Sequence, residues 1–274
     1  MHATPSDLGD IRPRDMDFEL DDTPRHWVAD AAVPTAMGNT LHMIFPMGER
    51  FFVRAVRHFQ EQIKDPELRA QIKGFYAQEG RHAHEHERVF KLLEDKHGYD
   101  LQPFLRLYKK IAFEVIEPRT SHKLRLAVTV ALEHYTAIMA EDALDGGLIG
   151  RAHASMRPLL MWHASEEIEH KAVAFDVLKQ VDDGYALRMA GMALATALLI
   201  GFWTLGTAML LRQEKIGWLE ALRQLRRARK ANPIGSRVFV RGIREYLRRD
   251  FHPWHNDNLE LARRTLAELE RTAA

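Results

Sequence analysis

The chain has 274 residues, 46% hydrophobic and 28% charged, which is enough apolar material for the core of one large domain. Its formal net charge of +1 gives no reason to expect a nucleic-acid partner. It has no cysteine, which excludes disulfides, zinc–thiolate sites, iron–sulfur clusters and a cysteine nucleophile. Residues 1–30 contain no apolar run of the signal-peptide type, so we expect a cytoplasmic protein.

The spacing of apolar residues is helical over most of the chain, with no alternating strand of useful length. Residues 1–35, which hold several prolines, are expected to form an irregular arm. The first bundle helix is expected from about Pro46 to Ile63, because proline suits a first helical turn. The second is expected over residues 66–97, with Asp65 as N-cap and Gly98 at its end.

The second half of the bundle is expected after a connecting helix at residues 101–117, whose length allows the crossover of a ferritin-like bundle. The third bundle helix should run from Ser121, a suitable N-cap, to Leu144. The fourth should run from about Ala152 to Val181. We therefore predict an all-α protein with a ferritin-like four-helix bundle over residues 36–186.

Each predicted bundle helix carries a glutamate inside an apolar stretch. In chain order these are Glu49, Glu79 with His82, Glu133, and Glu167 with His170. A spacing of three residues places a glutamate and its histidine on one helix face, so the glutamate can bridge two metals while the histidine binds one. Four carboxylates balance two divalent cations, and oxygen and imidazole donors suit iron or manganese. One Glu-x-x-His is usually a solvated pair, but two in this order match the ferritin-like di-iron pattern.

Several neighbouring side chains are further candidates. His163 shares a helix face with Glu167 and His170, so it is a candidate third imidazole ligand, with a core position as the alternative. Glu166 is an alternative to Glu167 as the ligand. His86 shares the face of the first Glu-x-x-His pair, but we expect it behind the ligands or on the surface.

The other polar neighbours are expected to take no part in metal binding. His84 and Glu85 point away from the shared face and should be solvated. His134 and Tyr135 are turned from Glu133 by about 100° or more, so His134 should be structural and no radical tyrosine is indicated.

Four stretches, at residues 45–52, 78–86, 131–137 and 162–176, resemble the bacterial family described as predicted metal-dependent hydrolase. The resemblance covers most of residues 25–250 and implies hydrolysis. The run at residues 163–170 is also similar to the di-iron arylamine N-oxygenases, which use an additional histidine there. That similarity covers the site only and does not extend to the arylamine substrate. It implies dioxygen activation at an iron pair held by Glu49, Glu79, His82, Glu133, His163, Glu167 and His170.

Residues 189–211 carry no charge and are long enough for a transmembrane helix. Residues 212–249 hold twelve Lys or Arg against three Glu, which favours a membrane surface. A single span would place the bundle outside the cytoplasm without a signal peptide. The alternatives are a hairpin turning near Gly201, an interfacial anchor, or a fifth helix packed on the bundle or between the subunits of a homodimer. Gly191, Gly201 and Gly206 would permit close packing.

These expectations divide the chain into an arm at 1–35, the bundle at 36–186, and an apolar segment with a basic helical C-terminal region at 187–274. The leading interpretation is a di-iron oxygenase or oxidase with two iron ions, or manganese, or one of each. Dioxygen would be its co-substrate, an external donor would supply electrons, and the substrate would be hydrophobic and lipid-like. The alternatives are a binuclear hydrolase and a non-enzymatic iron-handling protein. We expect it in the cytoplasm or peripheral or monotopic at the inner membrane.

Overall fold

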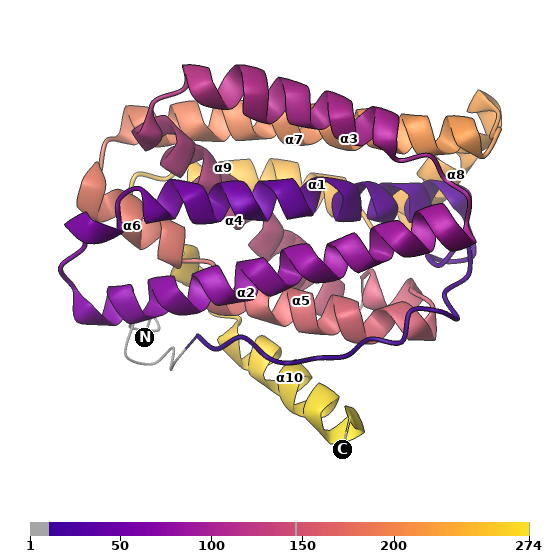
Figure 1. Cartoon of the computed structure of the whole chain (residues 1–274), viewed down its shortest axis with the longest axis horizontal. Helices are drawn as coiled ribbons and strands as arrows, with labels where there is room; N and C mark the ends of the chain where they lie inside the picture. The colour runs from indigo at the N-terminus through magenta and orange to yellow at the C-terminus, as the bar shows by residue number, and fades with distance from the viewer. Residues whose placement is uncertain (1–10, 146, 274) are drawn as a thin grey trace.

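A computed structural model describes residues 11–145 and 147–273, and residues 1–10 of the predicted arm lie outside them. The described chain is helical, apart from loops and one isolated bridge between Val28 and Ala152. The bundle consists of α1 (Ala32–Arg57), α2 (Pro66–Lys91), α4 (His122–Leu144) and the consecutive helices α5 (Arg157–His170) and α6 (Val173–Val181). These helices lie side by side (Figure 1). The prediction of an all-α bundle is confirmed.

The start of the first helix differs from the prediction. α1 begins at Ala32, fourteen residues before Pro46, which lies inside the helix and is buried. The irregular arm ends at Ala29 and Asp30, whose φ angles of 51° and 50° turn the chain before the helix begins. Pro34, and not Pro46, is the proline in the first turn, where its missing N–H costs no hydrogen bond.

The predicted ends of the second and third helices are confirmed. The side chain of Asp65 accepts hydrogen bonds from the first backbone N–H groups of α2, and Ser121 does the same for α4. α2 continues into the π-helical turn η3 (Leu92–Lys96) and ends at Gly98. The φ of +67° at Gly98 is the left-handed conformation that glycine adopts most easily.

The connection between the helix pairs is α3 (Gln102–Tyr108) followed by η4 (Lys109–Ile116) and η5 (Glu117–Arg119), as predicted. The fourth bundle helix starts later than predicted, because two 3-10 turns, η6 (Ile149–Arg151) and η7 (Ala154–Met156), precede α5. It is also interrupted after His170, where Lys171 and Ala172 form a turn between α5 and α6.

The apolar segment is the single helix α7 (Tyr185–Gln213), which packs along α1 and α4 (Figure 1). Two of its glycines allow this approach: a Cβ on Gly191 would lie 2.5 Å from the backbone of Ala127, and one on Gly206 would lie 2.5 Å from Thr40. Gly201 faces open space inside a continuous helix, so the predicted hairpin is wrong. Among the described residues α7 is the one helix long and apolar enough to cross a membrane, and its outward face is exposed.

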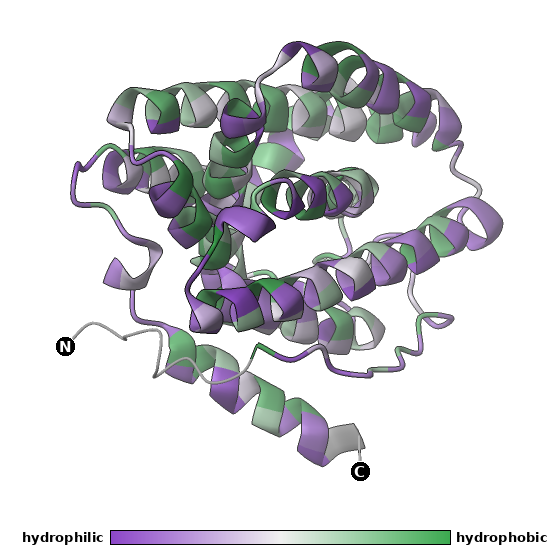
Figure 2. Ribbon diagram, turned by 60° about the vertical axis from the view of Figure 1, so that its left-hand side comes forward, coloured by the Kyte–Doolittle hydropathy of each residue, from purple (hydrophilic) through white to green (hydrophobic). Residues whose placement is uncertain are grey.

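The basic C-terminal region is also helical, with α8 (Trp218–Ala231), η8 (Ser236–Arg241), α9 (Gly242–Tyr246) and α10 (Leu259–Ala273). η8 and α9 pack on α4, where a Cβ on Gly242 would lie 2.8 Å from Ile138. α10 packs on α5. In Figure 2 it carries a hydrophobic and a hydrophilic face, as expected for a helix lying on a bundle.

The described part of the arm lies along the outside of α2 and α5 (Figure 1). Trp27 is 2% exposed, lies against Gly38 of α1, and donates a hydrogen bond to Asn39 at 2.7 Å. Ile11 packs against Gly74 of α2, where any Cβ would clash with its backbone. The arm is therefore anchored in the core at both of its described ends.

Candidate metal centre

The seven residues proposed as ligands point into one buried cluster in the middle of the bundle. None is more than 9% exposed, and every helix of the bundle except α6 contributes. α1 supplies Glu49, α2 supplies Glu79 and His82, α4 supplies Glu133, and α5 supplies His163, Glu167 and His170. The sequence-based selection therefore corresponds to one place in the fold.

One group of donor atoms belongs to Glu79, Glu133 and His170. His170 Nε2 lies 3.5 Å from Glu79 Oε1 and 3.5 Å from Glu133 Oε2. One ligand atom from each of the three residues lies within 4.8 Å of the others, which is compact enough to surround a single metal ion. We call this group the first subsite.

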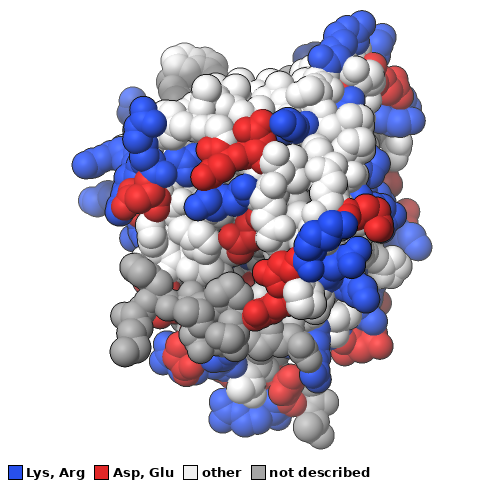
Figure 3. Space-filling model, turned by 90° about the vertical axis from the view of Figure 1, so that its left-hand side faces the viewer, with Lys and Arg blue, Asp and Glu red and all other residues white. Residues whose placement is uncertain are grey.

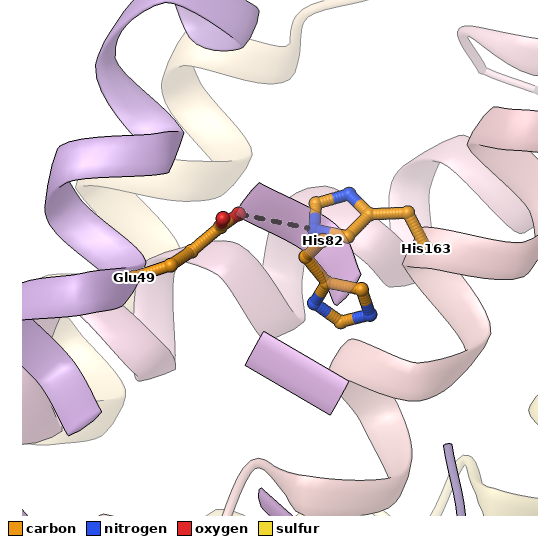
Figure 4. A group of neighbouring side chains, drawn as sticks. All are labelled: Glu49, His82 and His163. Atoms are coloured by element: carbon orange, nitrogen blue, oxygen red, sulfur yellow. Dashed lines mark ion pairs between the residues drawn. The ribbon is translucent and has the colours of Figure 1, made fainter. Parts of the chain in front are cut away.

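A second group belongs to Glu49, His82 and His163, which come from three different helices. Glu49 and His163 point toward each other, and the ring of His82 lies beside that of His163 (Figure 4). His163 Nε2 lies 3.7 Å from Glu49 Oε1. The donor atoms again lie within 4.8 Å of one another, and we call this group the second subsite.

Glu167 joins the two subsites. Its Oε1 lies 3.4 Å from His82 Nδ1, 3.2 Å from His163 Nε2 and 3.6 Å from His170 Nε2. Glu79 also reaches both groups, since its Oε2 lies 3.9 Å from His82 Nδ1. The two Glu-x-x-His glutamates thus occupy bridging positions, and their histidines lie at opposite subsites.

Many polar atoms of the cluster lack a hydrogen-bond partner among the described residues. These buried atoms are Glu49 Oε2, both carboxylate oxygens of Glu79 and of Glu133, Glu167 Oε2, His82 Nδ1, His163 Nε2 and His170 Nε2. Buried polar groups are almost always satisfied, so such a convergence needs a partner that is neither backbone nor side chain. Two divalent cations would satisfy these oxygens and imidazole nitrogens together, so the residues fit a two-metal site.

The electrostatics also favour cations. Burial, reinforced by the neighbouring carboxylates, raises the pKa values of Glu79 and Glu133 well above their usual range. Burial opposes ionisation of Glu49 too, but His86 and His163 lower its pKa to about 2. The pKa of Glu167 is likewise lowered, against burial, by His170 and its other histidine neighbours. The cluster thus crowds carboxylates that cannot all ionise unless positive charge lies between them.

Glu166 orients His82. Its Oε2 lies 3.0 Å from His82 Nε2, which leaves His82 Nδ1 directed at the cluster. Arg14 of the arm donates to Glu166 at 3.2 Å and balances its charge. Burial opposes protonation of His82, but Glu166 and Glu167 raise its pKa to about 10. Because Glu166 lies behind His82 and Glu167 lies in front of it, the geometry favours Glu167 as the ligand.

A corresponding contact orients His170, whose Nδ1 donates to Gln78 Oε1 at 2.9 Å. The amide of Gln78 in turn donates to Glu169 Oε2 at 2.9 Å and to the backbone oxygen of Arg12 at 3.1 Å. Hydrogen bonds of this kind fix the tautomer of a metal-binding imidazole. No spacing in the sequence identified Gln78 or the arm as part of this arrangement.

His86 lies closer to the site than a surface residue would. It is 2% exposed, and its Nε2 lies 3.3 Å from Glu49 Oε1. Its Nδ1 lies 2.7 Å from Nδ1 of His42, a buried residue of α1 that sequence reasoning missed. His42 lies seven residues before Glu49, on the same helix face, but the predicted helix began only at Pro46.

All four residues expected to take no part in metal binding lie outside the cluster. His84 is exposed, His134 is buried with its Nε2 3.0 Å from the backbone oxygen of Gly242, and the hydroxyl of Tyr135 pairs with Thr196. The prediction that Glu85 is solvated is wrong. It is 8% exposed because Arg88, one turn later, covers it and pairs with it at 2.9 Å.

An apolar cavity of about 90 Å³ lies next to the cluster, between α1, η4, α4 and α7. Gly48, which precedes Glu49, lines it, as do Leu132 and Thr136, which flank Glu133 along α4. Most of the other lining residues are Phe, Ile and Leu, whereas Arg125 and Glu117 supply charges. The cavity therefore borders the segments of α1 and α4 that carry Glu49 and Glu133, whose own side chains do not line it.

Comparison with known protein families matches residues 12–257 to the family described as "Predicted metal-dependent hydrolase". The match includes all seven residues of the cluster as well as Gln78 and Glu166. Neither the curated proteins nor the solved structures contain a match.

Proposed function

The chain belongs to the predicted metal-dependent hydrolase family, and from its site we propose that it is a di-iron enzyme that activates dioxygen to oxidise a hydrophobic substrate. The observation that carries this proposal is the donor set: four carboxylates and three imidazoles from four helices, all buried, with two glutamates in bridging positions. Such a set, with no sulfur donor, suits iron or manganese. Two bound irons would supply the binding and reduction of dioxygen.

The protein's own residues contribute orientation and the exclusion of water. Glu166 and Gln78 hold the two Glu-x-x-His imidazoles so that the nitrogens facing the cluster are free of protein hydrogen bonds. The raised pKa values of Glu79 and Glu133 show that their ionised forms depend on a counter-charge. A dry, preorganised site of this kind limits side reactions of reactive oxygen species with water.

The neighbouring cavity supports a hydrophobic substrate. Its walls are the aromatic and aliphatic side chains of α1, η4, α4 and α7, and it borders the residues that flank Glu49 and Glu133. An aliphatic or aromatic group placed there would lie against the segments of α1 and α4 that carry Glu49 and Glu133. An external electron donor would be needed to return the irons to the reduced state between turnovers.

The test is elemental analysis combined with oxygen consumption by the chemically reduced protein. We expect about two irons per chain, since the donor set forms two subsites, and rapid uptake of oxygen after reduction. The matched control is Glu85→Gln, which changes a buried glutamate of α2 that pairs with Arg88 outside the cluster. Full iron loading with no uptake of oxygen by the reduced protein would refute the proposal.

The second candidate function is hydrolysis, and the observation that favours it is the description of the family. In that case the metals would activate water as the nucleophile. Zinc-loaded protein would then cleave esters or amides without a reductant and under argon. Iron loaded into the same protein would remain inert toward oxygen, so the two metal forms distinguish the candidates.

A further inference from the structure

α8 is an exposed amphipathic helix with large apolar side chains directed at solvent. Trp218 is 71% exposed, Leu219 is 53% exposed and Leu222 is 41% exposed. None of its residues is buried, although the helix contacts α1, where Gln224 accepts a hydrogen bond from the backbone N–H of Val33 at 3.0 Å. A tryptophan and two leucines exposed together on one helix exceed the scattered apolar residues of an ordinary surface.

The same helix carries a strong positive charge. Its fourteen residues include five Lys or Arg and one Glu, which gives 5 − 1 = +4. Arg223 pairs with Glu220 at 2.5 Å. Four of the other cations have no ion pair within the described residues, and they follow the apolar residues along the helix: Arg226, Arg227, Arg229 and Lys230.

A cleft of about 630 Å³ opens beside α8 and reaches α1. Leu225 and Ala228 of α8 form one wall, and Met37 and Leu41 of α1 form another. Arg229 and Lys230 also line it. The cleft therefore combines apolar walls with cations that have no acidic partner in the described chain.

We propose that α8 docks on the surface of a lipid bilayer that contains anionic lipids. Trp218, Leu219 and Leu222 would enter the boundary between headgroups and acyl chains, and the cations that follow them would contact the lipid phosphates. A tryptophan at the membrane interface next to a basic stretch is typical of helices that bind the surface of anionic bilayers.

Two other occupants fit the observations less well. A second copy of this chain would place two α8 helices of charge +4 against each other, and these charges would repel. A nucleic acid would leave the exposed leucines without a partner. The opposite end of the molecule provides a contrast, because positive and negative side chains are interspersed there (Figure 3).

The tryptophans of this protein make the docking directly observable. Trp218 is 71% exposed, whereas Trp27, Trp162, Trp203 and Trp254 are at most 8% exposed. Vesicles of equal parts phosphatidylcholine and phosphatidylglycerol should shift the emission of the full-length protein to shorter wavelength and protect it from a soluble quencher. Vesicles of phosphatidylcholine alone should have a much smaller effect, because the cations would find no anionic partner. Trp218→Phe should still sediment with the anionic vesicles but lose the spectral change.

The charge requirement is tested with Arg226→Glu/Arg227→Glu, which should weaken sedimentation with anionic vesicles by about tenfold or more. The control is Lys73→Glu/Lys179→Glu, which makes the same change of net charge on α2 and α6, where both lysines are exposed. Equal sedimentation of the two double variants would overturn the proposal, and so would a lack of binding by the unmodified protein. Concentration-dependent burial of Trp218 without vesicles would assign α8 to a second copy instead.

Discussion

His42 and His86 face each other through their Nδ1 atoms at 2.7 Å, and Nε2 of His86 lies 3.3 Å from Glu49 Oε1. Burial, with the charges of His86 and His163, lowers the pKa of His42 well below its usual range, so His42 is neutral near pH 7. One ring must therefore donate the proton that the other accepts. When His86 donates, the lone pair of its Nε2 is free and is directed toward the second subsite.

This relationship predicts that His42 positions His86 as an additional donor for the metal beside Glu49. His42→Phe should lower the affinity of the second subsite by about 10–100-fold, the usual effect of losing an orienting hydrogen bond. The measurement is a metal titration followed by elemental analysis after dialysis. His58→Phe, an exposed position at the end of the same helix, is the control. If both variants kept their metals equally well, His42 would have only a packing role.

We expect Glu166 to affect metal affinity as strongly as a residue that hydrogen-bonds to a metal ligand usually does. Glu166→Gln keeps the shape of the side chain but removes the charge that stabilises the orientation of His82. We expect a loss of about 10–100-fold in affinity, with the fold retained. Glu85→Gln on α2 is the matched control, because Glu85 is also buried but pairs only with Arg88 among the described residues. Circular dichroism and thermal melting separate a loss of metal from a loss of fold.

The buried carboxylates of the cluster should destabilise the metal-free protein, and bound metal should stabilise the loaded protein. A cation at 100 times its Kd adds about 2.7 kcal/mol to the free energy of unfolding, so removing two such cations by chelation should lower Tm by about 10 °C. Glu79→Gln and Glu133→Gln remove carboxylates whose ionisation is opposed by burial and by each other. Without metal, these variants should melt at the same temperature as the unmodified protein or at a higher one. With metal, they should melt at a lower temperature than the unmodified protein. A lower Tm in both states would mean that these carboxylates have a structural role without metal.

The helical period explains why the sequence predicts the core of the site well. Glu79 and His82 share a face because they are three residues apart, and Glu167 and His170 share one for the same reason. An apolar environment around a glutamate further indicates an inward position. Since both signals are local, they need no knowledge of how the four helices pack.

The roles that sequence reasoning missed depend on contacts between residues far apart in the chain. Arg14 and Glu166 are 152 positions apart, so no local period relates them. Proline is common at helix starts and therefore favours a start at Pro46, but the apolar residues before it extend α1 and override that preference. α7 gives a further example of what the sequence alone leaves open. Its length and composition fit a membrane span and a bundle helix equally well.

Metal affinity should increase with pH toward about pH 10, where the metal-free His82 loses its proton. The pKa values of Glu79 and Glu133 are raised by burial and by other carboxylates, and that of His82 is raised to about 10 by Glu166 and Glu167 against burial. A raised pKa means that the metal-free group holds its proton to higher pH, and a cation must displace that proton. Each proton released makes affinity rise by about tenfold per pH unit. Titration calorimetry in buffers of different ionisation enthalpy measures the number of protons, which should fall in Glu79→Gln.

The apolar cavity gives a prediction that separates substrate access from metal binding. Ala112 of η4 lines the cavity and is 9% exposed, so Ala112→Leu would place three additional carbons into a space of about 90 Å³. We expect an unchanged metal content, because the cluster lies on other helices, and a fall of about tenfold or more in substrate-stimulated oxygen uptake, because a displaced substrate reacts slowly. Ala186→Leu, on the exposed face of α7, adds the same group to the surface and should change neither quantity. Equal oxygen uptake by the two variants would mean that the substrate reaches the metals by another route. Loss of metal from Ala112→Leu alone would instead mean that η4 supports the cluster through packing.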